Sequence, residues 1–112
     1  GPFFFGVATK FDEMMRNASS TPLVRIIRMR KVSFIDSTGL HNLELLIDSS
    51  HKEGTHVVLS GVNESVRTVL VNTGISRMIG NDHICDHISK AVIMANSLVD
   101  DIRKQKQDNT MR

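Results

Sequence analysis

The sequence predicts an α/β fold in which helices flank a mostly parallel β-sheet. Short apolar runs rich in β-branched residues recur at 23–29 and 56–60, as expected of strands covered on both faces. A stretch with apolar residues at helical spacing follows each run. Strands that alternate with helices favour parallel pairing, because each helix carries the chain back across the sheet.

The first predicted elements lie before residue 30. Residues 3–5 are three phenylalanines closed by Gly6, which indicates the end of a strand. Residues 8–17 suit a helix, and the polar residues 17–22, which end in proline, break it. The run 23–29 is the first central strand.

A basic group interrupts this strand and follows it. Arg25 and Arg28 fall within the apolar run, so we expect one end of the strand to be exposed to solvent, a wet end. Arg30 and Lys31 follow in a loop. An acidic lipid surface or an acidic partner could explain these cations. We interpret them as a solvated sheet end, because scattered surface charges commonly do nothing specific.

The middle of the chain predicts one helix and one strand. Residues 38–53 read as a helix that Gly54 ends, and the apolar positions Leu40, Leu43, Leu46 and Ile47 give its buried stripe. Residues 56–60 form the second central strand, which Gly61 ends.

The last third of the chain predicts two more helices. Asn63 can cap a helix that Gly74 ends, and a weaker strand is expected at 83–85. Asp86 can cap a long helix whose apolar stripe is Ile88, Ala91, Val92, Ala95, Leu98, Val99 and Ile102. The residues from Lys104 onward are polar, and we expect them to fray.

Length and composition bound the domain organisation. With 112 residues the chain suits one domain, which we assign to residues 1–104, with a polar tail over 105–112. The chain begins with Gly1-Pro2-Phe3-Phe4-Phe5, which reads like the inside of a domain. We therefore expect that the first strand is truncated and that the domain belongs to a longer parent chain. No apolar run is long enough to span a membrane, so this part is not expected to be membrane-inserted.

Net charge and cysteine content indicate which class of partner and which compartment to expect. The formal net charge is only +2, which does not favour a nucleic-acid partner. Cys85 is the only cysteine, so no internal disulfide can form, as is usual in a reducing compartment.

The motifs that would support catalysis or cofactor binding are absent or incomplete. Two residues separate Asp36 from Gly39 and no second copy exists, unlike the paired aspartates of an aspartic protease. No glycine-rich run ends in Gly-Lys-Ser/Thr, so no phosphate-binding loop is present. Residues 83–87 hold two histidines and Cys85 without a complementary cluster, so we expect no metal. We predict no enzymatic activity and no cofactor.

The sequence Asp36-Ser37-Thr38-Gly39 lies where a strand gives way to a helix. Asp36, Ser37 or Thr38 could each cap the first helical turn. The same free N–H groups would favour a phosphate on a hydroxyl there.

A second loop is expected beside the first. The residues Ser60, Gly61 and Asn63 follow the next strand, and parallel strands end at one edge of the sheet. This edge is where an α/β fold places its functional loops.

The run FIDSTGLHNLELL, followed by a glycine and the strand HVVLSGV, resembles the STAS domain. STAS domains occur as free-standing anti-sigma-factor antagonists and as cytoplasmic domains of SulP-family anion transporters. The resemblance extends from GPFFFG to the last helix. GPFFFG and the run Ile35 to His41 look like the transporter branch.

The resemblance implies a regulatory interaction domain. In the antagonist branch, the hydroxyl residue after the loop aspartate is phosphorylated, and here that position is Ser37. The implied partner-contact loop is Asp36, Ser37, Thr38, Gly39 and Asn42. The implied partners are the membrane domain of the same parent chain and a cytosolic protein or second subunit, at the cytoplasmic side of a bacterial inner membrane. The alternatives are a free-standing antagonist and a nucleotide-binding domain.

Overall fold

The computed structural model describes residues 21–111, so the elements predicted at 3–5 and 8–17 lie outside it. In chain order the elements are β1 (Val24–Arg28), α2 (Ser37–Lys52), β2 (His56–Ser60), α3 (Glu64–Asn72), α4 (Ile75–Ile79), the 3-10 helix η1 (Asn81–His83) and α5 (Ile88–Thr110). β1 and β2 pair in parallel, with Val24 opposite His56 and Arg28 opposite Ser60. The predicted α/β class with a parallel sheet and flanking helices is confirmed.

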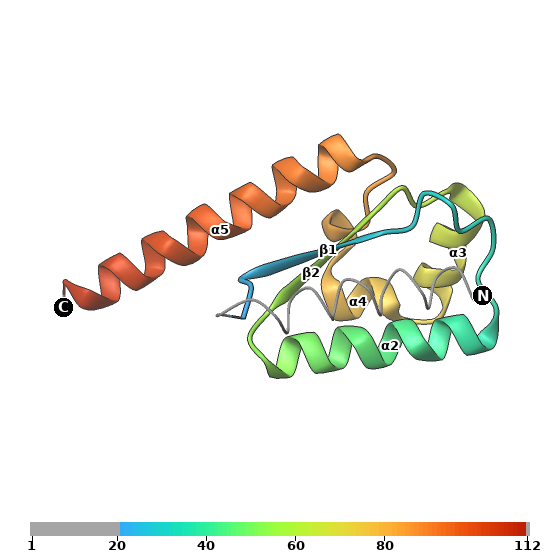
Figure 1. The fold of residues 1–112 in the computed structure, drawn as a ribbon, viewed down its shortest axis with the longest axis horizontal. Helices are drawn as coiled ribbons and strands as arrows, with labels where there is room; N and C mark the ends of the chain where they lie inside the picture. Colours follow the sequence, from blue (N-terminus) through green and yellow to red (C-terminus); the bar gives the residue numbers. More distant parts are fainter. Residues whose placement is uncertain (1–20, 112) are drawn as a thin grey trace.

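The two strands lie between α2 and α5 (Figure 1). One face of the sheet packs on α2, α3 and α4 through a core that includes Ile27, Leu43, Ile47, Val57, Leu59, Leu70 and Ile75. The other face packs on α5 through Val58, Cys85 and Ala91, with Val24, Ile26, Met94 and Leu98 around them. Both strands are therefore covered on both faces, as their sequences predicted.

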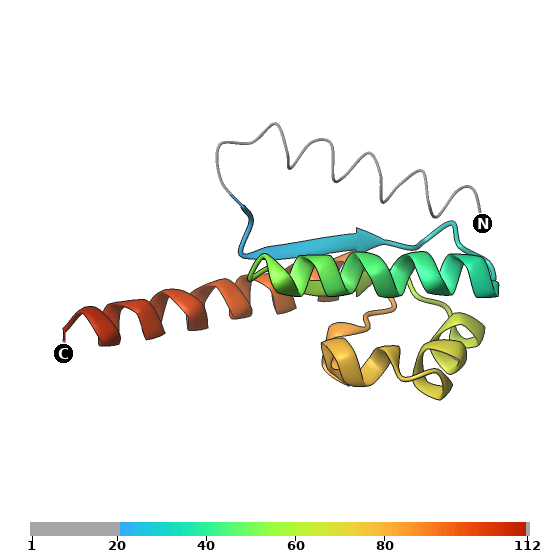
Figure 2. The ribbon, with the colours of Figure 1, turned by 90° about the horizontal axis from the view of Figure 1, so that it is seen from below.

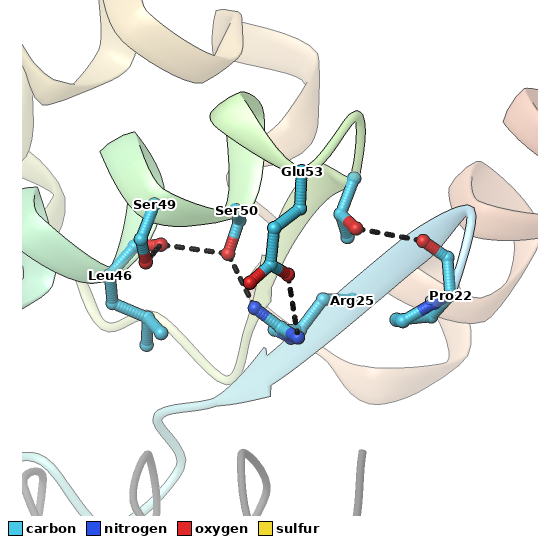
Figure 3. A network of polar contacts seen from close by, with 7 residues as sticks. Pro22, Arg25, Leu46, Ser49, Ser50 and Glu53 are labelled. Carbon is cyan, nitrogen blue, oxygen red and sulfur yellow. Dashed lines mark hydrogen bonds and ion pairs between the residues drawn. The ribbon is translucent and has the colours of Figure 1, made fainter. Parts of the chain in front are cut away.

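A polar contact joins β1 to the end of α2 (Figure 3). Arg25 is only 4% exposed, and its Nη1 donates to Ser50 Oγ at 2.6 Å. Glu53 lies 3.9 Å from Arg25 Nη2 at the end of the same helix. Arg28 is exposed at the other end of the strand. The prediction of one wet end is correct for Arg28 and wrong for Arg25, which is buried because α2 supplies a hydroxyl for it.

The segment between α3 and α5 differs from the prediction. Gly74 has φ +89°, so it ends α3, but α4 begins directly after it. The strand expected at 83–85 is reduced to a single bridge between Leu59 and Ile84. Because η1 coils the preceding residues, only Ile84 and Cys85 remain extended beside β2.

Helix α5 begins and ends differently from the prediction. His87, not Asp86, is its cap, and His87 Nδ1 accepts from the N–H of Ser89 at 3.0 Å. Asp86 instead pairs with Lys90 at 2.9 Å, and this hydrogen-bonded cation lowers the pKa of the Asp86 carboxyl. Val92 is 42% exposed, so it lies outside the stripe of α5 that packs on the sheet, which includes Ile88, Ala91, Met94 and Leu98.

The helix also continues past the predicted frayed end. It runs to Thr110, and every side chain from Arg103 onward in the described range is exposed. In Figure 2 this last part of α5 projects beyond the strands. The domain boundary at residue 104 stays a prediction.

Candidate functional site at the carboxyl end of the sheet

Two loops meet where β1 and β2 end. The first loop, 29–36, leads from β1 to α2, and the second loop, 61–63, leads from β2 to α3. The N–H of Met29 donates to the carbonyl of Ser60 at 2.7 Å, which extends the strand pairing into both loops. Ser60 itself is 1% exposed, and its carbonyl holds the start of the first loop in place.

Asp36 is the residue that caps α2. Its Oδ1 accepts from the N–H of Gly39 at 2.7 Å, and its carbonyl accepts from the N–H of Leu40 at 2.8 Å. The sequence left the cap open among Asp36, Ser37 and Thr38, and the geometry selects Asp36. The carboxylate also lies at the positive end of the helix dipole, which favours its charge there.

Ser37 and Thr38 begin α2 and are exposed to solvent. Neither hydroxyl takes part in a hydrogen bond within residues 21–111. Because Asp36 already caps the helix, these hydroxyls have no structural bond to break when they are modified or bound. Gly39 is buried behind them, and Asn42 is half-buried one turn further along.

Asn63 joins the two loops. Its Nδ2 donates to the carbonyls of Val32 and Ser33 at 3.2 and 3.1 Å. Its Oδ1 accepts from the N–H of Val66 at 2.8 Å, which caps α3. One side chain therefore fixes the start of a helix and the path of the neighbouring loop.

Gly61 makes a close backbone contact with the first loop. Its φ is +68°, and a Cβ atom added there would lie 2.7 Å from both Cα and N of Arg30. Only glycine fits this position without a shift of the backbone. The predicted loop residues Ser60, Gly61 and Asn63 are thus brought against 29–36.

Part of this edge was not predicted from the sequence. Phe34 was not among the predicted site residues, and its side chain is 68% exposed between the buried residues Val32 and Ile35. The carbonyls of Val32 and Ser33 were not predicted as partners of Asn63 either. The available signal was the spacing of Val32 and Ile35, which leaves Phe34 between two core positions.

The histidines and cysteine of residues 83–87 make contacts within the fold. His83 Nδ1 lies 2.9 Å from the carbonyl of Val57, and His87 caps α5. Burial and the nearby Asp86 charge raise the pKa of the Cys85 thiol. No group of three or more potential ligand residues within 21–111 is placed to hold a metal ion.

Comparison with known families identifies the fold. The STAS domain family matches residues 1–91 of the chain. The chain belongs to the STAS domain family. A comparison with curated proteins gave no match. Among the described helices, none has the length and apolarity needed to cross a membrane.

Two solved structures resemble the chain closely. A sulfate transporter family protein from Wolinella succinogenes is 41% identical, with a TM-score of 0.75, and the match covers 89% of this chain and 82% of that one. The STAS domain of a SulP transporter from Vibrio cholerae is 35% identical, with a TM-score of 0.76, and covers 88% and 77%. The predicted resemblance to SulP-type STAS domains is confirmed.

Proposed function

We propose that this STAS domain is the regulatory interaction domain of a bacterial SulP-type anion transporter. Both solved relatives carry transporter names, at 41% and 35% identity over most of the chain. The domain would lie at the cytoplasmic side of the inner membrane and would catalyse no reaction of its own. Its partner would be the membrane domain of the same parent chain, a second subunit or a cytosolic protein.

The observation that carries this proposal is the exposed start of α2 on a fixed frame. Ser37 and Thr38 face solvent, while Asp36 is held by Gly39 and the loop before it is held by Asn63. A partner that contacts these hydroxyls meets a surface whose shape is set before binding. Preorganisation of this kind reduces the ordering cost of association.

Phosphorylation of Ser37 would change this surface without unfolding it. A phosphate adds about −1.5 to −2 charges at neutral pH. The N–H groups of the first turn favour a phosphate there, while the neighbouring Asp36 carboxylate repels it. The net effect is a strongly anionic helix start, which would attract or repel a partner according to the partner's charge.

The test uses the full-length parent transporter reconstituted in vesicles. Uptake of sulfate, bicarbonate and succinate is measured for the unmodified protein, for Ser37→Glu and for the triple variant Ser37→Ala, Thr38→Ala, Asn42→Ala. We expect a several-fold change in uptake of the transported anion, because the contact surface is altered. Mass spectrometry of the protein purified from its native cells would detect phosphate on Ser37.

Ser49→Glu is the matched control, because Ser49 is an exposed serine at the other end of α2. It adds the same charge to the same helix, away from the loops, and uptake should not change. Unaltered uptake and partner binding in all Ser37, Thr38 and Asn42 variants would contradict the proposal.

A further inference from the structure

Three basic residues lie at the end of β1 and in the first loop, 29–36. Arg28 ends β1, Arg30 and Lys31 follow it, and all three side chains are exposed. Within residues 21–111 none of them forms an ion pair. By contrast, Lys52 and Lys90 on the helices pair with Asp48 and Asp86 at 3.1 and 2.9 Å.

The same loop exposes its aromatic ring. Phe34 is the only phenylalanine in residues 21–111, and the chain has no Trp or Tyr. Its side chain is 68% exposed, although a buried phenylalanine would stabilise the fold by about 1.5–3 kcal/mol. We call Arg28, Arg30, Lys31 and Phe34 the basic–aromatic patch.

The backbone that carries the patch is held at several points. The N–H of Met29 bonds to Ser60, and the N–H of Val32 bonds to the carbonyl of Met29 at 3.0 Å. Gly61 lies against the backbone of Arg30, and Asn63 holds the carbonyls of Val32 and Ser33. The exposed side chains therefore project from a fixed loop.

Within residues 21–111, the loop before α2 and the start of α3 carry more basic than acidic side chains. Their acidic residues are Asp36, the cap of α2, and Glu64, in the first turn of α3, against the three cations of the patch. Both carboxylates lie at helix starts, and α2 and α3 direct their positive dipole ends to this edge. An anionic surface would thus meet an attractive field.

We propose that the basic–aromatic patch binds the anionic headgroups of a membrane surface. The cations would contact headgroup phosphates, and the Phe34 ring would enter the boundary between headgroups and acyl chains. A short loop with unpaired cations and one projecting ring suits a lipid surface better than a nucleic acid, because the chain's formal net charge is only +2. This inference goes beyond the proposed function and does not depend on it.

Vesicle co-sedimentation with the 112-residue chain tests the proposal. Vesicles of phosphatidylcholine alone are compared with vesicles that also contain phosphatidylglycerol. We expect binding to the anionic vesicles only, with a loss as salt is added, because salt screens exposed charges. The double variant Arg30→Gln, Lys31→Gln should lower the partition coefficient roughly 25-fold, since each cation near an anionic surface contributes about 1 kcal/mol.

Phe34→Ser is an independent variant that leaves the charge unchanged. We expect it to weaken binding about tenfold, because an inserted aromatic ring contributes an apolar term. Leu45→Ser is its control, since Leu45 is 54% exposed on α2, outside the patch. Circular dichroism of each variant shows whether it is folded.

The charge control is Lys104→Gln, Lys106→Gln, which removes the same charge from the exposed end of α5. This variant should bind like the unmodified chain. The proposal is overturned if the two double variants lose binding equally, because net charge alone would then explain it. It is also overturned if anionic vesicles do not bind, or if DNA binds as well as vesicles and Phe34→Ser has no effect.

Discussion

Gly61 occupies a position where another residue would strain the backbone twice. Its φ of +68° disfavours any residue with a side chain, and an added Cβ would meet the backbone of Arg30 at 2.7 Å. We expect Gly61→Ala to lower the free energy of unfolding by about 3 kcal/mol, as measured by urea denaturation.

Gly54→Ala separates the two causes. Gly54 has φ +80°, but an added Cβ would have no neighbour within 4 Å. This variant should cost only about 1 kcal/mol, the strain of the left-handed conformation. Equal losses of stability in the two variants would show that the close approach of Gly61 to Arg30 adds nothing to the cost of a Cβ atom.

Cys85 makes the free energy of unfolding depend on pH, and the direction of this dependence follows from its pKa. Its pKa is raised, first by burial and then by the charge of Asp86, so the folded state disfavours the thiolate. The stabilisation is present below the thiol pKa of the unfolded chain and is lost as pH rises through the folded pKa. Denaturation at increasing alkaline pH should show falling stability.

Cys85→Ala is the comparison for this pH series. The variant lacks the thiol, so its stability should fall less steeply over the same pH range. The thiol of the unmodified chain should also react slowly with a water-soluble disulfide reagent until urea unfolds it, because the thiolate is the reactive form. Fast reaction of the folded chain at neutral pH would contradict the raised pKa.

At the scale of elements, the contact between Arg25 and Ser50 joins β1 to α2. Ser50 is fully buried and lies 2.6 Å from Arg25 Nη1 (Figure 3). Ser50→Ala removes an acceptor from a buried charged group, which should cost about 1–3 kcal/mol in urea denaturation.

Ser49→Ala is the matched control for this contact. Both serines donate to the carbonyl of Leu46, but Ser49 is exposed and does not contact Arg25. Its replacement should change stability by less than about 0.5 kcal/mol. If both variants changed the free energy of unfolding by the same small amount, the contact between Arg25 and Ser50 would contribute nothing to stability.

The elements also show which parts of the fold local patterns predict. The strands at 24–28 and 56–60 and the helix that follows each were predictable, because their apolar spacing reflects burial. The strand at 83–85 was not, because its pairing depends on how η1 and Leu59 meet in space. The helix α4 was missed because Gly74 signals an end whether or not another helix follows.

The candidate site follows the same division. The position of Asp36 to Gly39 at the edge of the sheet followed from the order of elements. The choice of Asp36 as cap, and the bonds from Asn63 to Val32 and Ser33, depend on side-chain geometry that spacing does not encode. Phe34 was missed because exposure of one ring between two core residues is a tertiary outcome.

For the molecule as a whole, the end of α5 should be dispensable for folding. The side chains from Arg103 to Met111 are exposed. A chain that ends at Lys104 should keep its free energy of unfolding within about 0.5 kcal/mol, while circular dichroism shows less helix. A chain that ends at Ser97 loses Leu98, which packs against the core around Val58, and should be clearly less stable.

The length of α5 also determines where a label or tag can be attached without covering the loops. The helix runs away from the loop end, and the longest extent of the structure is 47 Å (Figures 1 and 2). A fluorophore or affinity tag placed after Met111 therefore sits far from Ser37 and Phe34. Immobilisation through that end would leave both the hydroxyls and the ring free to meet a partner in solution.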